Sequence, residues 1–105
     1  MEEFVPKIFE YLGIVVMFYS NEHEPLHVHG KYQNFESKAE FIIEDGKILE
    51  IIVKNVKGRR PLPNAQMKDF KNFVEKFKDD IVQKWIDYFV LHKSISCIKI
   101  EGRVK

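Results

Sequence analysis

The period of the apolar residues changes once along the chain, and this change limits the possible folds more than any other feature. Up to residue 53, apolar residues form short runs or alternate with polar ones, which is typical of β-strands. From Asn64 they recur every three or four residues, which is typical of amphipathic helices. Strands followed by helices predict an α+β fold. We expect a small antiparallel sheet of three to five strands with two helices packed on one face.

The clearest local signal is a β-hairpin around Asp45-Gly46. The segments Ser37–Glu44 and Ile48–Val53 have the composition of strands, and Asp-Gly is a two-residue turn that needs positive φ at both positions. Glu44 and Lys47 flank this turn, so they should lie opposite each other.

Other strands are expected on either side of the hairpin. Ile14–Tyr19 is a continuous run of β-branched and aromatic residues, which predicts a central strand buried on both faces. His27–Tyr32 is expected to be extended, and Ile95–Ile100 to return to the sheet as an edge strand.

The helical region is too long for one straight helix. A helix from Asn64 to His92 would be about 43 Å long at 1.5 Å per residue, and a compact chain of this size is only about 33 Å across. We therefore expect a break near residues 78–80. The aromatic stripe along both helices, with Trp85 at its centre, should pack on the sheet as core.

Composition limits the functional classes. A length of 105 residues predicts a single domain over residues 1–105, and the net charge of +1 predicts that nucleic-acid binding would need a local basic patch. The single cysteine, Cys97, excludes an internal disulfide, favours a reducing cytoplasm and is expected to be a buried thiol. No apolar run approaches the roughly 20 residues of a membrane helix, and the first residues are not a signal peptide. We expect a cytoplasmic protein with no membrane contact.

Three of the four histidines lie within seven residues, at His23, His27 and His29. Pro25 predicts a loop before His27. On a strand, His27 and His29 share one face, and His23 on the loop could approach them. Three imidazoles with a bound water form a catalytic type of site for zinc or another divalent metal. Glu22 or Glu24 could then act as a base or as a fourth ligand.

The same residues allow other interpretations. The histidines and carboxylates could bond to each other and to the loop backbone and only hold the turn in place, or they could bind an anionic or polar partner. In an enzyme, His27 and His29 would carry out the acid–base chemistry of a hydrolase or ribonuclease, assisted by Glu24.

A second candidate site is the segment 54–63, which contains four basic residues and no acidic one. Gly58, Pro61 and Pro63 predict a loop. This loop is either a solvated linker or an anion contact just before a helix N-terminus, formed by Lys57, Arg59 and Arg60. Such a patch would give weak, salt-sensitive nucleic-acid binding.

The sequence also resembles a small bacterial family known as domain of unknown function 4160. The resemblance covers about residues 6 to 100. It begins with Pro6, Gly13-Ile14 and Phe18-Tyr19, and its most specific part lies in the segment 21–29, which reads Asn-Glu-His-Glu-Pro-Leu-His-Val-His. It continues through Asp45-Gly46, the Leu62-Pro63 pair and Trp85. The chain departs from the family pattern at Leu26, where the family usually has a second proline.

The resemblance implies an α+β protein without an assigned activity. Members are often encoded beside another small domain, which suggests a regulatory role or one half of a toxin–antitoxin-like pair. Of the candidate residues, His23, Pro25, His27 and His29 match the motif. The leading expectation is therefore a small cytoplasmic binding or regulatory module with a small partner protein. A metal-assisted hydrolase or ribonuclease and a weak nucleic-acid binder are the alternatives, and the oligomeric state is left open.

Overall fold

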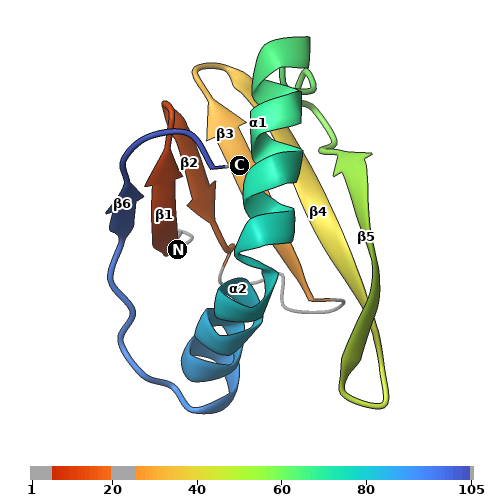
Figure 1. The fold of residues 1–105 in the computed structure, drawn as a ribbon, viewed down its shortest axis with the longest axis vertical. Coiled ribbons are helices and arrows are strands. Elements are labelled where there is room, and N and C mark those ends of the chain that lie inside the picture. Colours follow the sequence, from red (N-terminus) through yellow and green to blue (C-terminus); the bar gives the residue numbers. More distant parts are fainter. Residues whose placement is uncertain (1–5, 20–25, 105) are drawn as a thin grey trace.

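The structure is a computed structural model that describes residues 6–19 and 26–104. These residues form one six-stranded sheet with two α-helices on one of its faces (Figure 1). The strand order is β5-β4-β3-β2-β1-β6. The strands are β1 (Lys7–Tyr11), β2 (Ile14–Met17), β3 (His27–Tyr32), β4 (Phe35–Glu44), β5 (Lys47–Asn55) and β6 (Ile98–Ile100). The helices are α1 (Asn64–Lys76) and α2 (Lys78–Trp85), and a π-helical turn over Ile86–Val90 continues α2.

The hairpin around Asp45-Gly46 is confirmed. Asp45 has φ of 52° and Gly46 has φ of 77°, and Glu44 pairs with Lys47 across the turn. The strand before the turn begins at Phe35, two residues earlier than the sequence pattern indicated. The strand predicted over Ile14–Tyr19 is β2, which ends two residues earlier, at Met17, and lies next to β3 in the middle of the sheet.

The predicted number and direction of the strands were wrong. The sheet has six strands instead of three to five, and it is mixed because β6 runs parallel to β1. Parallel neighbours need a crossover connection, and here the chain returns to β1 only after passing through both helices (Figure 1). β6 has three residues and pairs with a strand almost ninety residues away. Its local sequence therefore does not indicate its direction.

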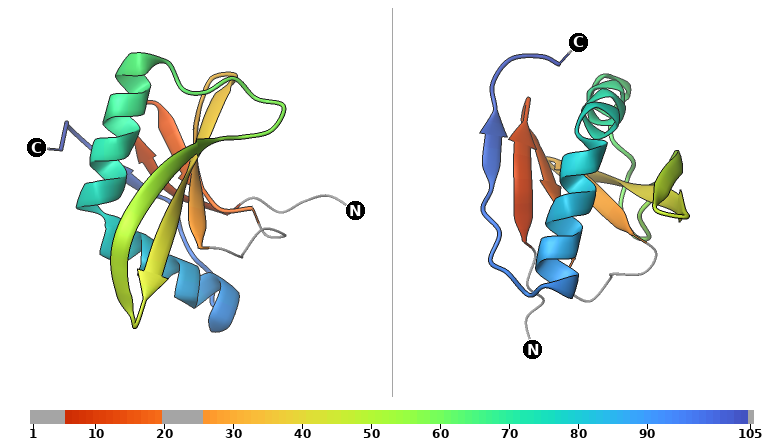
Figure 2. Two further views of the ribbon diagram at one scale, coloured as in Figure 1. Left: turned by 90° about the vertical axis from the view of Figure 1, so that its right-hand side faces the viewer. Right: turned by 60° about the horizontal axis from the view of Figure 1, so that its bottom comes forward.

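The expected helix break is confirmed at Phe77, which separates α1 from α2. Figure 2 shows both helices on the same side of the sheet. Aromatic contacts join the layers: the ring centroids of Phe73 and Tyr11 are 4.9 Å apart, and those of Phe18 and Phe89 are 5.7 Å apart. Trp85 packs against this core, with its ring centroid 5.2 Å from that of Phe89. Among the described residues, neither helix has the length and apolar character needed to cross a bilayer.

The C-terminal strand is exposed at the border of the sheet. Ile98 is 44% exposed, and Cys97, just before it, is exposed as well. The prediction of a buried thiol was wrong, because Cys97 is exposed just before the short edge strand β6.

The two layers approach most closely at Gly30 in β3. A Cβ atom at this position would lie 2.5 Å from a ring carbon of Phe70 in α1. Phe70 is fully buried. Because side chains alternate along a strand, the position of Gly30 under α1 directs its neighbours His29 and Lys31 to the opposite face. The same alternation places His27 on that opposite face.

The variant Gly30→Ala tests this contact. The added methyl group must displace the Phe70 ring, so we expect a loss of about 1–3 kcal/mol in the free energy of unfolding, as for other overpacked core positions. Urea denaturation measures this loss. In the double variant Gly30→Ala/Phe70→Leu, the loss in the free energy of unfolding should be smaller than the sum of the losses of the two single variants. Additive losses would contradict the assigned contact.

Candidate functional site

The polar residues of the sheet gather on the face opposite the helices, which we call the histidine face. In the β3–β4 pair, His27 lies opposite Glu40, His29 opposite Lys38, and Lys31 opposite Glu36. Residues directly opposite in antiparallel strands point to the same face. The turn at residues 33–34 sets this register, so it also determines which carboxylates come near which imidazoles.

Glu36 is the most deeply buried charged residue of this face, with 0% of its surface exposed. Its Oε2 atom accepts a hydrogen bond of 2.8 Å from the Tyr19 hydroxyl and lies 2.9 Å from Nδ1 of His29. The rings of Tyr19 and His29 also meet edge to face, with centroids 4.2 Å apart. With the proton on Nδ1, the carboxylate fixes the tautomer and orientation of the His29 ring, as carboxylate partners of functional histidines do.

His27 lies beside His29. Their ring centroids are 5.1 Å apart, and the side chains come from alternate positions of one strand. Both are buried: His27 is 5% exposed and His29 is 2% exposed. The structure therefore brings together two of the three histidines singled out in the sequence.

Of the predicted basic residues, Arg59 is the one that reaches this cluster. Its Nε atom is 3.8 Å from Oε1 of Glu36, which is close enough for an ion pair and too far for a hydrogen bond. Oε1 is buried and has no hydrogen-bond partner among the residues described. The basic loop is held there by two bonds, from the Glu36 N–H to the Arg60 carbonyl and from the Leu62 N–H to Ser37 Oγ. Lys57 and Arg60 have exposed side chains.

A second carboxylate, Glu40, connects the cluster to solvent. Its Oε1 is 2.8 Å from Nζ of Lys54 in β5, and its Oε2 is 3.7 Å from Nζ of Lys38. The pKa of Glu40 is lowered from its ordinary value, first by the hydrogen bond from Lys54 and then by the positive charges around it, while burial opposes the shift. Glu40 is therefore ionised at neutral pH, in a rim that also contains two lysines.

The three-histidine metal hypothesis remains a prediction. His23 and Glu24 lie outside the residues that the structure describes, as does Glu22. Within 6–19 and 26–104, no group of three or more histidine, cysteine, aspartate or glutamate side chains is arranged to hold a metal ion. His27 and His29 could supply two imidazole ligands to such a site.

Sequence reasoning missed Tyr19, Glu36 and Glu40 as members of the cluster. Tyr19 belongs to the predicted apolar strand, and Glu36 lies just before the predicted strand Ser37–Glu44, so neither is a candidate on local pattern alone. The alternation of β4 contained a usable signal, since Glu36, Lys38 and Glu40 all occupy the polar side of that strand.

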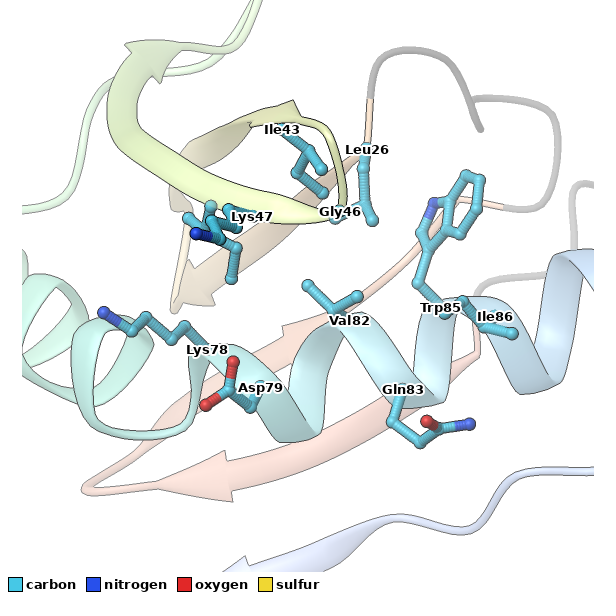
Figure 3. Close-up of a pocket in the computed structure, with 11 residues that line it drawn as sticks. Leu26, Ile43, Gly46, Lys47, Lys78, Asp79, Val82, Gln83, Trp85 and Ile86 are labelled. Atoms are coloured by element: carbon cyan, nitrogen blue, oxygen red, sulfur yellow. The ribbon is translucent and has the colours of Figure 1, made fainter.

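A separate groove lies between the β4–β5 hairpin and α2 (Figure 3). Its volume is about 600 Å³, and Leu26, Ile43, Val82 and Trp85 contribute apolar walls. Among the described residues that line it there is no histidine, and Asp79 is the single carboxylate. The described part of its lining has no imidazole, and its carboxylate is exposed, so the histidine face is the stronger candidate for acid–base chemistry.

The comparison with protein families identifies the family of the chain. The family model of domain of unknown function 4160 matches residues 13–86, which is more than half of the chain and includes His27, His29, Glu36 and Trp85. The chain belongs to this family. No curated protein and no solved structure matches it significantly.

Breaking the His29–Glu36 pair should be costly. In His29→Leu, the Glu36 carboxylate stays buried with its hydrogen bond from Tyr19 but without its imidazole partner. We expect a loss of about 3 kcal/mol in the free energy of unfolding. Chemical denaturation checks this. The double variant His29→Leu/Glu36→Met removes both members and should recover most of the loss; a double variant as unstable as the single one would contradict the pairing.

The Glu40–Lys54 ion pair predicts a pH dependence. Because the folded pKa of Glu40 is lowered, the pair stabilises the protein above the unfolded pKa, and this contribution disappears as the pH falls through the folded pKa. Lys54 is half exposed, so Lys54→Met should cost only about 0.5 kcal/mol at neutral pH. The difference from wild type should vanish in strong acid, as measured by denaturation at several pH values. A stability difference between wild type and Lys54→Met that does not depend on pH would contradict the assigned ion pair.

Proposed function

We propose that the histidine face is an acid–base site that cleaves a phosphodiester, with RNA as its substrate class. The observation behind this proposal is the fully buried Glu36 carboxylate, which holds Nδ1 of His29 next to the ring of His27. Two adjacent imidazoles, one oriented by a carboxylate, are the parts that proton transfer at neutral pH needs.

The chemistry uses the two imidazoles in opposite roles. In RNA, one neutral imidazole takes the proton of the 2′-hydroxyl while the 2′-oxygen attacks phosphorus. The other, as imidazolium, gives a proton to the departing 5′-oxygen. The O2′–P bond forms, the P–O5′ bond breaks, and one proton is taken up as one is released, so the protein returns to the same total charge. Glu36 provides a counter-charge whenever His29 carries the extra proton.

The cations around the cluster suit an anionic substrate. Arg59 and Lys54 are about half exposed, with 47% and 52% of their side-chain surface accessible, and both end next to a carboxylate of the histidine face. An arginine beside a reacting phosphoryl group stabilises the charge that develops there. The basic loop and the histidines, which were separate candidates in the sequence, then serve one site.

Cleavage of single-stranded RNA by the purified untagged protein tests the proposal. We expect His27→Gln to lower kcat/KM by about 10²- to 10⁴-fold, the usual effect of losing an acid or a base. Glu36→Gln should also lower kcat/KM, because it removes the carboxylate that orients His29 and provides its counter-charge. His92→Gln, at the exposed fourth histidine, is the matched control and should leave the rate unchanged. Arg59→Gln should lower kcat, because it removes the cation assigned to the developing phosphoryl charge, whereas Arg60→Gln, its exposed neighbour, should leave kcat unchanged.

Further measurements separate the alternatives. Activity that disappears with a chelator and returns with zinc would favour the metal-assisted hydrolase, with His23 as the third ligand. RNA that binds with little dependence on salt and is not cut would argue against both the ribonuclease and binding through the basic loop. Absence of any cleavage by a folded wild-type protein would overturn the proposal.

The burial of the imidazoles favours a second candidate, a binding or regulatory module for a small partner protein, such as one half of a toxin–antitoxin-like pair. Rings that are 5% and 2% exposed can stabilise the face as well as react. In that case the half-exposed charges at the rim would contact the partner. The test is capture from the native host with wild type and with Lys54→Glu. Recovery of the same partner with both, or of no partner, would argue against this role for the rim.

A further inference from the structure

We propose that two copies of this chain associate through β5, antiparallel and centred on Ile52. The two sheets would join into one continuous sheet of twelve strands, six from each copy. The occupant of the edge is thus a second copy of the same chain, and the proposal does not depend on the activity of the histidine face.

β5 is the long free edge of the sheet. It has nine residues, and no described strand lies beyond it (Figures 1 and 2). The opposite edge, β6, has only three residues. An edge strand presents alternating N–H and C=O groups that can pair with another strand. Proteins usually block such an edge with proline or a bulge. β5 contains no proline, and its irregularity lies near the hairpin turn, opposite Ile42 and Ile43.

The apolar side chains of β5 are incompletely covered. Ile51, Ile52 and Val53 are only partly buried, and Leu49 is 60% exposed. On the helix side, a groove of about 390 Å³ lies between β5 and α1, lined in part by Ile51, Val53 and Val74. A second β5 added at this edge would bring its own Ile51 and Val53 to the same side, next to the groove.

The charges of β5 select one register. With the two-fold axis at Ile52, Ile52 faces Ile52 of the second copy, and Glu50 faces its Lys54 twice, once on each side of the axis. All three residues lie on the histidine face, because Glu50 is opposite Ile42, Ile52 is opposite Glu40 and Lys54 is opposite Lys38. Directly opposite charges of unlike sign stabilise strand pairs. The strand is therefore complementary to itself.

Neighbouring registers lack this match. A two-fold axis at Ile51 would set Glu50 against Ile52 and Lys54 against Ile48, each a charge beside an apolar chain. An axis at Glu50 would set this carboxylate against itself, which is destabilising. An axis at Ile52 therefore has the best charge pattern of the three.

Charge-reversal variants test the register. Glu50→Lys alone gives lysine against lysine, and Lys54→Glu alone gives glutamate against glutamate, so each should weaken the dimer by about tenfold or more. An equimolar mixture of the two variants restores both opposite-charge pairs and should dimerise as wild type does. The readout is molar mass by sedimentation over a concentration series. Lys47→Glu, nearer the turn, is the matched control and should leave the dimer unchanged.

Disulfide trapping gives an independent readout. In a Cys97→Ser background, Ile52→Cys should form a covalent dimer under mild oxidation, because directly opposite Cβ atoms approach to about 4.5 Å, which small shifts bring within the disulfide range. Leu49→Cys should not, since it would lie opposite Asn55. A wild-type chain that is monomeric at all concentrations, or a mixture of the two charge variants that stays monomeric, would overturn the proposal.

Discussion

The contact between Phe70 of α1 and Gly30 of β3 determines which side of the sheet becomes core. Because only a glycine leaves room for the ring at this point, α1 can approach β3 closely and cover its Val28–Gly30 side. Side chains alternate along a strand, so His27 and His29 are placed on the other side without a separate constraint. The same contact that completes the hydrophobic core thus also selects the face on which polar chemistry can take place.

Burying charged groups on the histidine face costs folding free energy, and the bonds within this face offset that cost. Removing a carboxylate such as Glu36 from water is unfavourable unless hydrogen bonds and opposite charges replace the lost hydration. Tyr19, His29 and Arg59 provide these replacements from three separate segments of the chain. A wholly apolar face would stabilise the sheet without this desolvation penalty. A buried charge with a histidine bonded to it is the observation on which the proposed acid–base site rests.

Lys54 takes part in both the proposed acid–base site and the proposed dimer. Within one chain it bonds to Glu40, at the rim of the histidine face. Across the proposed axis at Ile52, it also lies opposite Glu50 of the second copy. The two histidine faces would then lie on the same side of one continuous sheet. The chain belongs to the family of domain of unknown function 4160. The two proposals rest on the arrangement of the histidine face and of β5.

The sequence alone determined the features that depend on neighbouring residues. Asp45-Gly46 specified its turn through backbone conformation, the helical period began at Asn64, and the His-x-His spacing placed two imidazoles on one face. Only the tertiary structure decided that β6 runs parallel to β1, that Glu36 bonds to His29 and Tyr19, and that Arg59 approaches the same carboxylate. These contacts depend on strand register and on the docking of distant segments, and a local pattern of residue types contains neither.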